Sequence, residues 1–111
     1  MYALWLDWDL SKNKPEIFSI LRKYIKEESW ERYKTKKHLI HKVWSSNEDT
    51  KHFSAFYLWE TKESLQEEID TMFRIKKMTG VDPSIKISEI EAIQKGISEN
   101  KDITLIGKAK L

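Results

Sequence analysis

The sequence contains no cysteine, and only three glycines and two prolines occur among its 111 residues. Without cysteine the chain can form no disulfide bond, no thiolate nucleophile and no zinc site with sulfur ligands. The glycines stand at positions 80, 96 and 107, too far apart to build a phosphate-binding loop. A Gly-x-Ser-x-Gly nucleophile turn is absent as well. These absences exclude several common kinds of catalytic site.

Long apolar segments and a surplus of one charge are also missing. No apolar run approaches the roughly 20 residues that a bilayer-spanning helix needs, and the N-terminus lacks the basic region and cleavage site of a signal peptide. The 20 basic residues nearly balance the 18 acidic ones, which leaves no broad positive field for nucleic acid. We therefore expect a cytoplasmic protein with neither a nucleic acid nor a membrane as its partner.

Tryptophan, by contrast, is abundant, with five residues in this short chain. They are Trp5, Trp8, Trp30, Trp44 and Trp59, and four of them fall in segments whose pattern predicts a strand. A domain of this size cannot easily bury so many large rings on its own. We therefore expect the rings to line a ligand pocket or to fill an interface between two copies of the chain.

The spacing of apolar residues divides the chain into strands and helices. Alternation predicts strands over residues 2–10, 38–46, 52–60 and 84–93. Helical spacing predicts one helix from Pro15 to about Tyr33 and a second from an N-cap at Thr61 to a C-cap at Gly80. The order β-α-β-β-α-β is typical of the ferredoxin-like α+β fold, with an antiparallel sheet and both helices on one face. We expect a single domain over residues 1–111, in which residues 96–111 form a tail with a short fifth strand at 102–106.

The side of this sheet that the helices leave open is predicted to carry aromatic rings, which would be unstable in water. Two copies packed face to face would enclose a space, so we expect a homodimer with the architecture of a dimeric α/β barrel. If Leu4 and Leu6 face the helices, Trp5 and Asp7 lie on the open side.

For the third strand, assigning Phe56 and Leu58 to the helices places Tyr57 and Trp59 on the open side. The second strand is ambiguous, because either of two alternating sets can face inward. These sets are Leu39, His41 and Val43, or Ile40, Lys42 and Trp44.

If His41 faces inward, it shares an enclosed space with the Asp7 carboxylate and the Tyr57 phenol. An apolar space with a few convergent polar groups is typical of small-molecule sites. We predict His41 as the general base, Asp7 as the group that orients it and Tyr57 as a donor to a developing oxyanion. The indoles predicted to bind substrate are Trp5, Trp59 and Trp44. The competing interpretation is that these side chains only pack at a subunit interface.

A metal site is not expected. His38 and His41 are three residues apart, so on a strand their side chains point to opposite faces. The remaining histidine, His52, begins another strand near solvent, and the chain has no cysteine to complete a ligand set.

Four segments of the sequence resemble the YdhR-type family of mono-oxygenases. They are HLIHKVWSS (38–46), FYLWETKES (56–64), GVDPSIK (80–86) and the final KAKL (108–111). The resemblance implies a dimeric α/β barrel, similar to cofactor-free oxygenases of polyketide biosynthesis. In the wider superfamily, the residue at the position of His41 tends to face the barrel cavity. In YdhR-type sequences this residue is aromatic and often tryptophan. We therefore expect a cofactor-independent mono-oxygenase that acts on a small aromatic or enolisable substrate.

The IsdG-type haem-degrading branch of the same superfamily gives a second comparison. That branch has an asparagine on the first strand, a tryptophan at the end of the third strand and an axial histidine on the second helix. Trp59 matches the tryptophan and Asp7 falls near the asparagine, but residues 62–79 contain no histidine. We therefore expect no haem and no other cofactor. The main alternative to an enzyme is a non-catalytic small-molecule-binding or structural dimer of the same fold.

Overall fold

A four-stranded sheet with helices over one of its faces forms the centre of the computed structural model, which describes residues 1–99 and 107–110. The strands are β1 (Tyr2–Asp9), β2 (Leu39–Asn47), β3 (His52–Trp59) and β4 (Ser84–Glu89). They lie in the order β2-β3-β1-β4, and every neighbouring pair is antiparallel. The predicted ferredoxin-like arrangement is confirmed. The last strand ends at Glu89, earlier than expected, and the fifth strand predicted at 102–106 lies outside the described residues.

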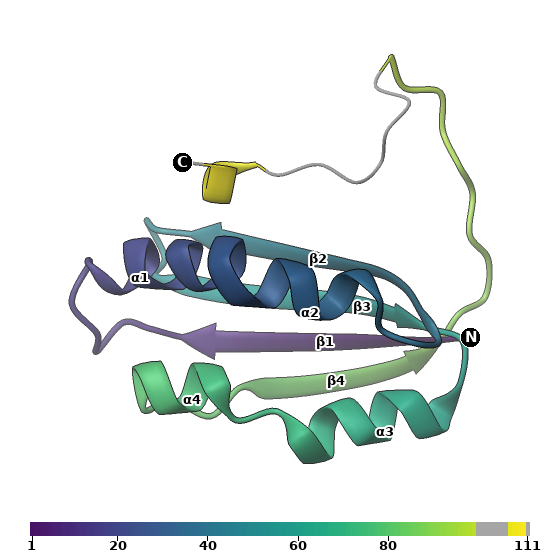
Figure 1. Cartoon of the computed structure of the whole chain (residues 1–111), viewed down its shortest axis with the longest axis horizontal. Coiled ribbons are helices and arrows are strands. Elements are labelled where there is room, and N and C mark those ends of the chain that lie inside the picture. Colours follow the sequence, from purple (N-terminus) through teal and green to yellow (C-terminus); the bar gives the residue numbers. More distant parts are fainter. Residues whose placement is uncertain (100–106, 111) are drawn as a thin grey trace.

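The first predicted helix is a continuous helical run with a wider turn in its middle. It consists of α1 (Ile17–Tyr24), the π-helical turn η1 (Ile25–Ser29) and α2 (Trp30–Lys34). Both Ile25 and Ser29 at the ends of the turn are buried. The run lies over β2 and β3 and extends along them (Figure 1).

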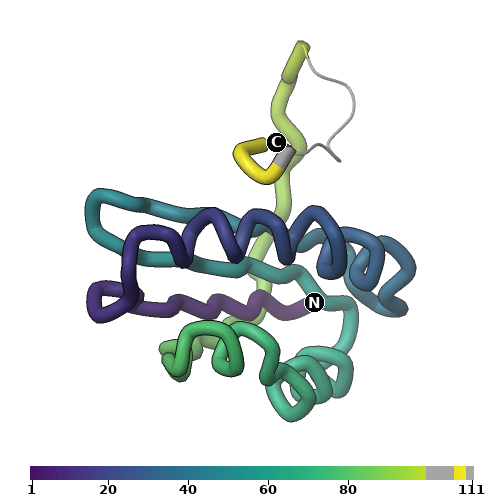
Figure 2. The backbone as a smooth tube through the Cα atoms, turned by 60° about the vertical axis from the view of Figure 1, so that its left-hand side comes forward, coloured from purple at the N-terminus to yellow at the C-terminus, as the bar shows by residue number. Residues whose placement is uncertain are grey.

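The second predicted helix is divided into α3 (Lys62–Thr71) and α4 (Arg74–Thr79), because the backbone leaves the helical region at Met72 and Phe73. Both of its predicted caps are confirmed. The Thr61 hydroxyl accepts a hydrogen bond from the Ser64 amide at 3.1 Å, and Gly80 closes α4 with a φ of 74°. Figure 2 shows the two helical runs side by side over the same face of the sheet.

Strand register decides which side chains meet the helices, since directly opposed residues of an antiparallel pair share a face. Leu4 pairs with Tyr57, which pairs in turn with Lys42, so all three lie on the helix side. Tyr57 is 2% exposed and Trp59 is fully buried in the core. The prediction that Tyr57 and Trp59 lie on the open side is therefore wrong. Alternation separated the two sets of β3 correctly but could not tell which set faces the helices.

The opposite face, which we call the open face, carries Trp5, Asp7, His41, Val43 and Phe56. The rings of Trp5 and Phe56 lie 4.2 Å apart between centroids. Trp5 is nevertheless 48% exposed and Val43 is 52% exposed. The prediction that Trp5 and Asp7 lie on the open face is confirmed. None of the helices within the described ranges has the length and apolar character needed to cross a membrane.

Candidate active site

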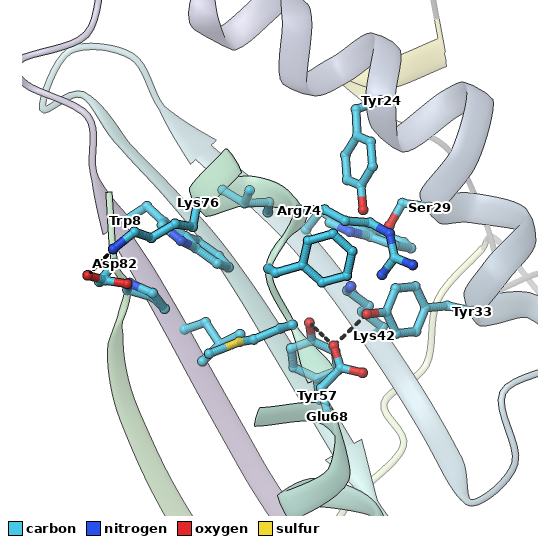
Figure 3. A pocket seen from close by; sticks show the side chains of 16 residues that line it. Trp8, Tyr24, Ser29, Tyr33, Lys42, Tyr57, Glu68, Arg74, Lys76 and Asp82 are labelled. Carbon is cyan, nitrogen blue, oxygen red and sulfur yellow. Dashed lines mark hydrogen bonds and ion pairs between the residues drawn. The ribbon is translucent and has the colours of Figure 1, made fainter. Parts of the chain in front are cut away.

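A cavity of about 270 Å³ lies between the sheet and the helices, and we call it the helix-side cavity (Figure 3). Trp8 of β1 and Trp44 of β2 form part of its wall, and Met72 and Phe73 from the break between α3 and α4 contribute another part. Ligand pockets are commonly about 300–1,000 Å³. The helix-side cavity lies just below that range and has room only for a compact ligand.

A buried carboxylate, that of Glu68 on α3, lies at one end of this cavity. Glu68 is only 3% exposed. The Tyr33 hydroxyl donates a hydrogen bond to its Oε2 atom at 2.5 Å, and the Tyr57 hydroxyl donates to the same oxygen at 3.0 Å. A buried carboxylate is costly unless it is hydrogen-bonded, and these two phenols stabilise it. Residues from α2, α3 and β3 thus meet at one oxygen atom.

Both phenols act as permanent donors in this arrangement. Burial raises the pKa of Tyr33 and of Tyr57 well above the usual value, and the negative charge of Glu68 raises the pKa of each further. Each hydroxyl therefore keeps its proton at neutral pH. The described part of the chain provides no hydrogen bond to the second oxygen of Glu68, Oε1, which leaves that atom available to a ligand.

Lys42 of β2 enters the same cavity beneath a group of aromatic rings. Its Nζ atom lies 3.4 Å from the centre of the Tyr33 ring, 4.5 Å from that of Tyr57 and 4.8 Å from that of Trp44. No carboxylate among the described residues lies within 4 Å of this nitrogen. Burial lowers the pKa of Lys42 well below its ordinary value, against the attraction of Glu68.

The residues predicted as one site are divided between the two faces of the sheet. Tyr57 and Trp44 line the helix-side cavity, and Trp59 stacks against Tyr57 with ring centroids 5.9 Å apart. Trp5, Asp7 and His41 lie on the open face. Tyr57 and Trp59 were predicted to share one site with these three residues. That prediction is wrong, because the two groups lie on opposite faces of the sheet.

Asp7 contacts a different histidine from the one expected. Its Oδ2 atom lies 2.6 Å from Nδ1 of His52, and its Oδ1 accepts a hydrogen bond from Ser54 at 2.6 Å. Asp7 was predicted to orient His41, but its hydrogen bonds in the described part of the chain go to His52 and Ser54. That His41 acts as a base stays a prediction.

Sequence reasoning missed Glu68, Tyr33 and Lys42, although a signal existed for two of them. Glu68 falls three residues after Leu65 and just before Ile69, inside the apolar stripe of its helix. Lys42 alternates with His41 on its strand, so placing His41 on the open side already implies that Lys42 lies on the helix side. The described residues contain no group of three or more metal-ligating side chains that could hold an ion.

Comparisons with known proteins agree with this fold. The profile of the family described as putative mono-oxygenase ydhR matches residues 18–101. The crystal structure of a putative antibiotic biosynthesis monooxygenase from Deinococcus radiodurans superposes with a TM-score of 0.62 and 11% identity, covering 88% of this chain and 100% of that chain. A dimeric ferredoxin-like protein from an uncultured marine organism gives a TM-score of 0.52 and 18% identity, covering 87% of this chain and 98% of that one.

A search of curated proteins finds no match. At such low identities the two solved structures establish the fold alone. The family profile, in contrast, spans well over half of the sequence. The chain therefore belongs to the ydhR family of putative mono-oxygenases.

Proposed function

We propose that this protein is a cofactor-independent mono-oxygenase whose active site is the helix-side cavity. The observation that carries the proposal is the buried Glu68 carboxylate, which accepts two phenol hydrogen bonds through Oε2 and leaves Oε1 free of a hydrogen bond from the described residues. Such a carboxylate can accept a proton from a bound substrate. The aromatic wall and the modest volume favour a compact aromatic or enolisable substrate.

The reaction we propose converts a CH2 group that is acidified by a carbonyl, as in a 1,3-diketone or in the keto form of a phenol, into a second carbonyl. Glu68 removes one proton, and the resulting carbanion reduces dioxygen by one electron. The two radicals combine to form a carbon–oxygen bond, and the peroxide takes up a proton. Loss of the remaining C–H proton then breaks the O–O bond, so that CH2 and O2 become C=O and H2O.

The surrounding side chains have distinct parts in this scheme. Tyr33 and Tyr57 each donate their single O–H to Oε2 of Glu68, which holds the carboxylate in place and leaves Oε1 to accept the substrate proton. The rings of Trp8 and Trp44 give the carbanion an apolar wall, which limits its contact with water and slows its reprotonation.

Oxygen uptake by dialysed protein in the presence of a chelator tests the proposal. With small 1,3-diketones and dihydroxybenzenes as probes, we expect at least one compound to consume one O2 per turnover. Under ¹⁸O2, one labelled atom should appear in the product and one in water. Replacing Tyr57 by phenylalanine is expected to lower turnover about 100-fold, because one of the two hydrogen bonds that position the Glu68 carboxylate is lost.

The same assay distinguishes this site from the one predicted on the open face. If His41→Ala removes turnover and Tyr57→Phe leaves it intact, the helix-side cavity is not the active site. Uptake that disappears on chelation would contradict the cofactor-independent chemistry.

We further propose that two copies of the chain pack through their open faces. Trp5, Val43 and Phe56 lie in one row across three strands, and the first and second of these are half exposed. An apolar row of this kind is typical of an interface. The dimeric ferredoxin-like protein named above supports this assembly by similarity of fold.

A charge placed in the centre of the row should separate the subunits. For Trp5→Lys we expect sedimentation at the mass of one chain, 13.3 kDa, at concentrations where the native protein sediments at twice that mass. Buried aromatic anchors commonly contribute 2 kcal/mol or more, which corresponds to at least roughly a 30-fold change in dissociation constant. Lys23→Glu, on the exposed side of α1, provides the control. A native protein that sediments as a monomer would contradict the proposal.

A further inference from the structure

We propose that Lys42 is a nucleophile that forms an imine with small carbonyl compounds in the helix-side cavity. The inference rests on the cavity assigned in the proposed function, but it requires no dioxygen. It adds amine catalysis to that site and specifies aldehydes and ketones as its ligands.

The position of the Lys42 amine carries the argument. Lys42 is fixed on β2 directly opposite Tyr57 of β3, and Figure 3 shows its side chain beside the Tyr33 ring in the cavity. Surface lysines commonly pair with carboxylates, whereas no carboxylate of the described residues is within 4 Å of this amine. The nitrogen is therefore not engaged in an ion pair that a ligand would have to break.

The surroundings favour the neutral, nucleophilic form of the amine. Removing an ammonium group from water disfavours its charged form and lowers its pKa. The faces of the Tyr33, Tyr57 and Trp44 rings oppose this shift of the Lys42 pKa. The charge of Glu68 opposes it as well, whereas the charges of Arg32 and Lys36 add to it. Burial dominates the lowered pKa of Lys42. Desolvated lysines of this kind are the ones that form Schiff bases.

The adjoining acid and phenols supply the proton transfers that such chemistry needs. The amine adds to the carbonyl carbon, forming a C–N bond, and one proton moves from nitrogen to oxygen to give a carbinolamine. With one further proton, water leaves and a protonated imine remains. Glu68 Oε1 can then remove a proton from the carbon next to the imine, forming an enamine. Every step is reversible, and none changes the oxidation state.

Reductive trapping under nitrogen tests the inference. With benzaldehyde and cyanoborohydride at pH 7, we expect mass mapping to place the benzyl adduct on Lys42 at least 10-fold more than on Lys23, an exposed lysine of α1 that lies outside the proposed subunit interface. The adduct on residue 42 should vanish in Lys42→Arg and persist in Lys23→Arg. Between pH 9 and pH 7, labelling of a lysine in an unstructured model peptide falls about 10-fold per unit, whereas labelling of Lys42 should fall much less.

A second measurement follows the removal of a proton from the carbon next to the carbonyl group. In D2O, the protein should exchange the benzylic protons of phenylacetone, and Lys42→Met should lose at least 10-fold in exchange rate. Equal labelling of both lysines at pH 7, or unchanged exchange in both Lys42→Arg and Lys42→Met, would overturn the inference. If trapping fails while the native protein still consumes oxygen, the imine is wrong and the mono-oxygenase proposal stands. If trapping succeeds and no probe consumes oxygen, the reverse holds.

Discussion

Replacement of Glu68 by glutamine is expected to lower turnover by about 100- to 10,000-fold, which is the usual contribution of a general base. Glutamine has the same shape, and its amide oxygen can accept the hydrogen bonds that Tyr33 and Tyr57 donate. It cannot accept a proton from the substrate. The variant should therefore stay folded and bind substrate while proton removal fails.

The measurement is oxygen uptake at saturating and at low substrate, with unfolding curves recorded in parallel. We expect kcat and kcat/KM to fall together, because the lost interaction acts only in the transition state. Glu67→Gln is the matched control, since Glu67 precedes Glu68 on α3 but is exposed to solvent. Equal turnover in Glu68→Gln and in the native protein would exclude Glu68 as the base.

The arrangement of elements could be predicted from the sequence because local patterns encode it. Alternating apolar residues marked the strands, and the hydroxyl of Thr61 and the left-handed Gly80 marked the ends of the second helical segment. Leu4 and Leu6 correctly indicated the helix side of β1, which places Asp7 on the open face by alternation.

The face of β3 could not be predicted in the same way. This strand has rings on both sides, with Tyr57 and Trp59 on one and Phe56 on the other, so hydrophobicity does not distinguish them. The choice depends on the register with β1, which places Tyr57 opposite Leu4. A shift of one residue would reverse every side chain of the strand.

The candidate site escaped prediction for a related reason. Charged residues are normally assigned to solvent, so neither Lys42 nor Glu68 was predicted to belong to the site. The contacts that explain their positions come from residues distant in sequence. Tyr33 and Glu68, for example, are 35 residues apart. A charged residue inside an apolar pattern was the available signal, and here it marks the polar end of the cavity.

Truncation of Trp59 to alanine is expected to lower the free energy of unfolding by about 3–5 kcal/mol, the usual cost of removing a buried aromatic ring. Trp59 is fully buried and stacks on Tyr57 at an interplanar angle of 15°. Denaturant unfolding followed by circular dichroism measures the change. The loss of stability should be the same at every protein concentration, because the space left by the Trp59 ring lies within one chain.

Trp5→Ala provides the contrast, since Trp5 is 48% exposed and its main ring contact is Phe56. An aromatic pair contributes about 0.5–1.5 kcal/mol beyond its buried area, so in dilute protein we expect a much smaller loss than for Trp59→Ala. If the open faces join two copies, the effect of Trp5→Ala should grow as the native protein is concentrated, because only the native dimer is then stabilised by mass action. A larger loss for Trp5→Ala than for Trp59→Ala in dilute protein would mean that the two faces of the sheet have been assigned the wrong way round.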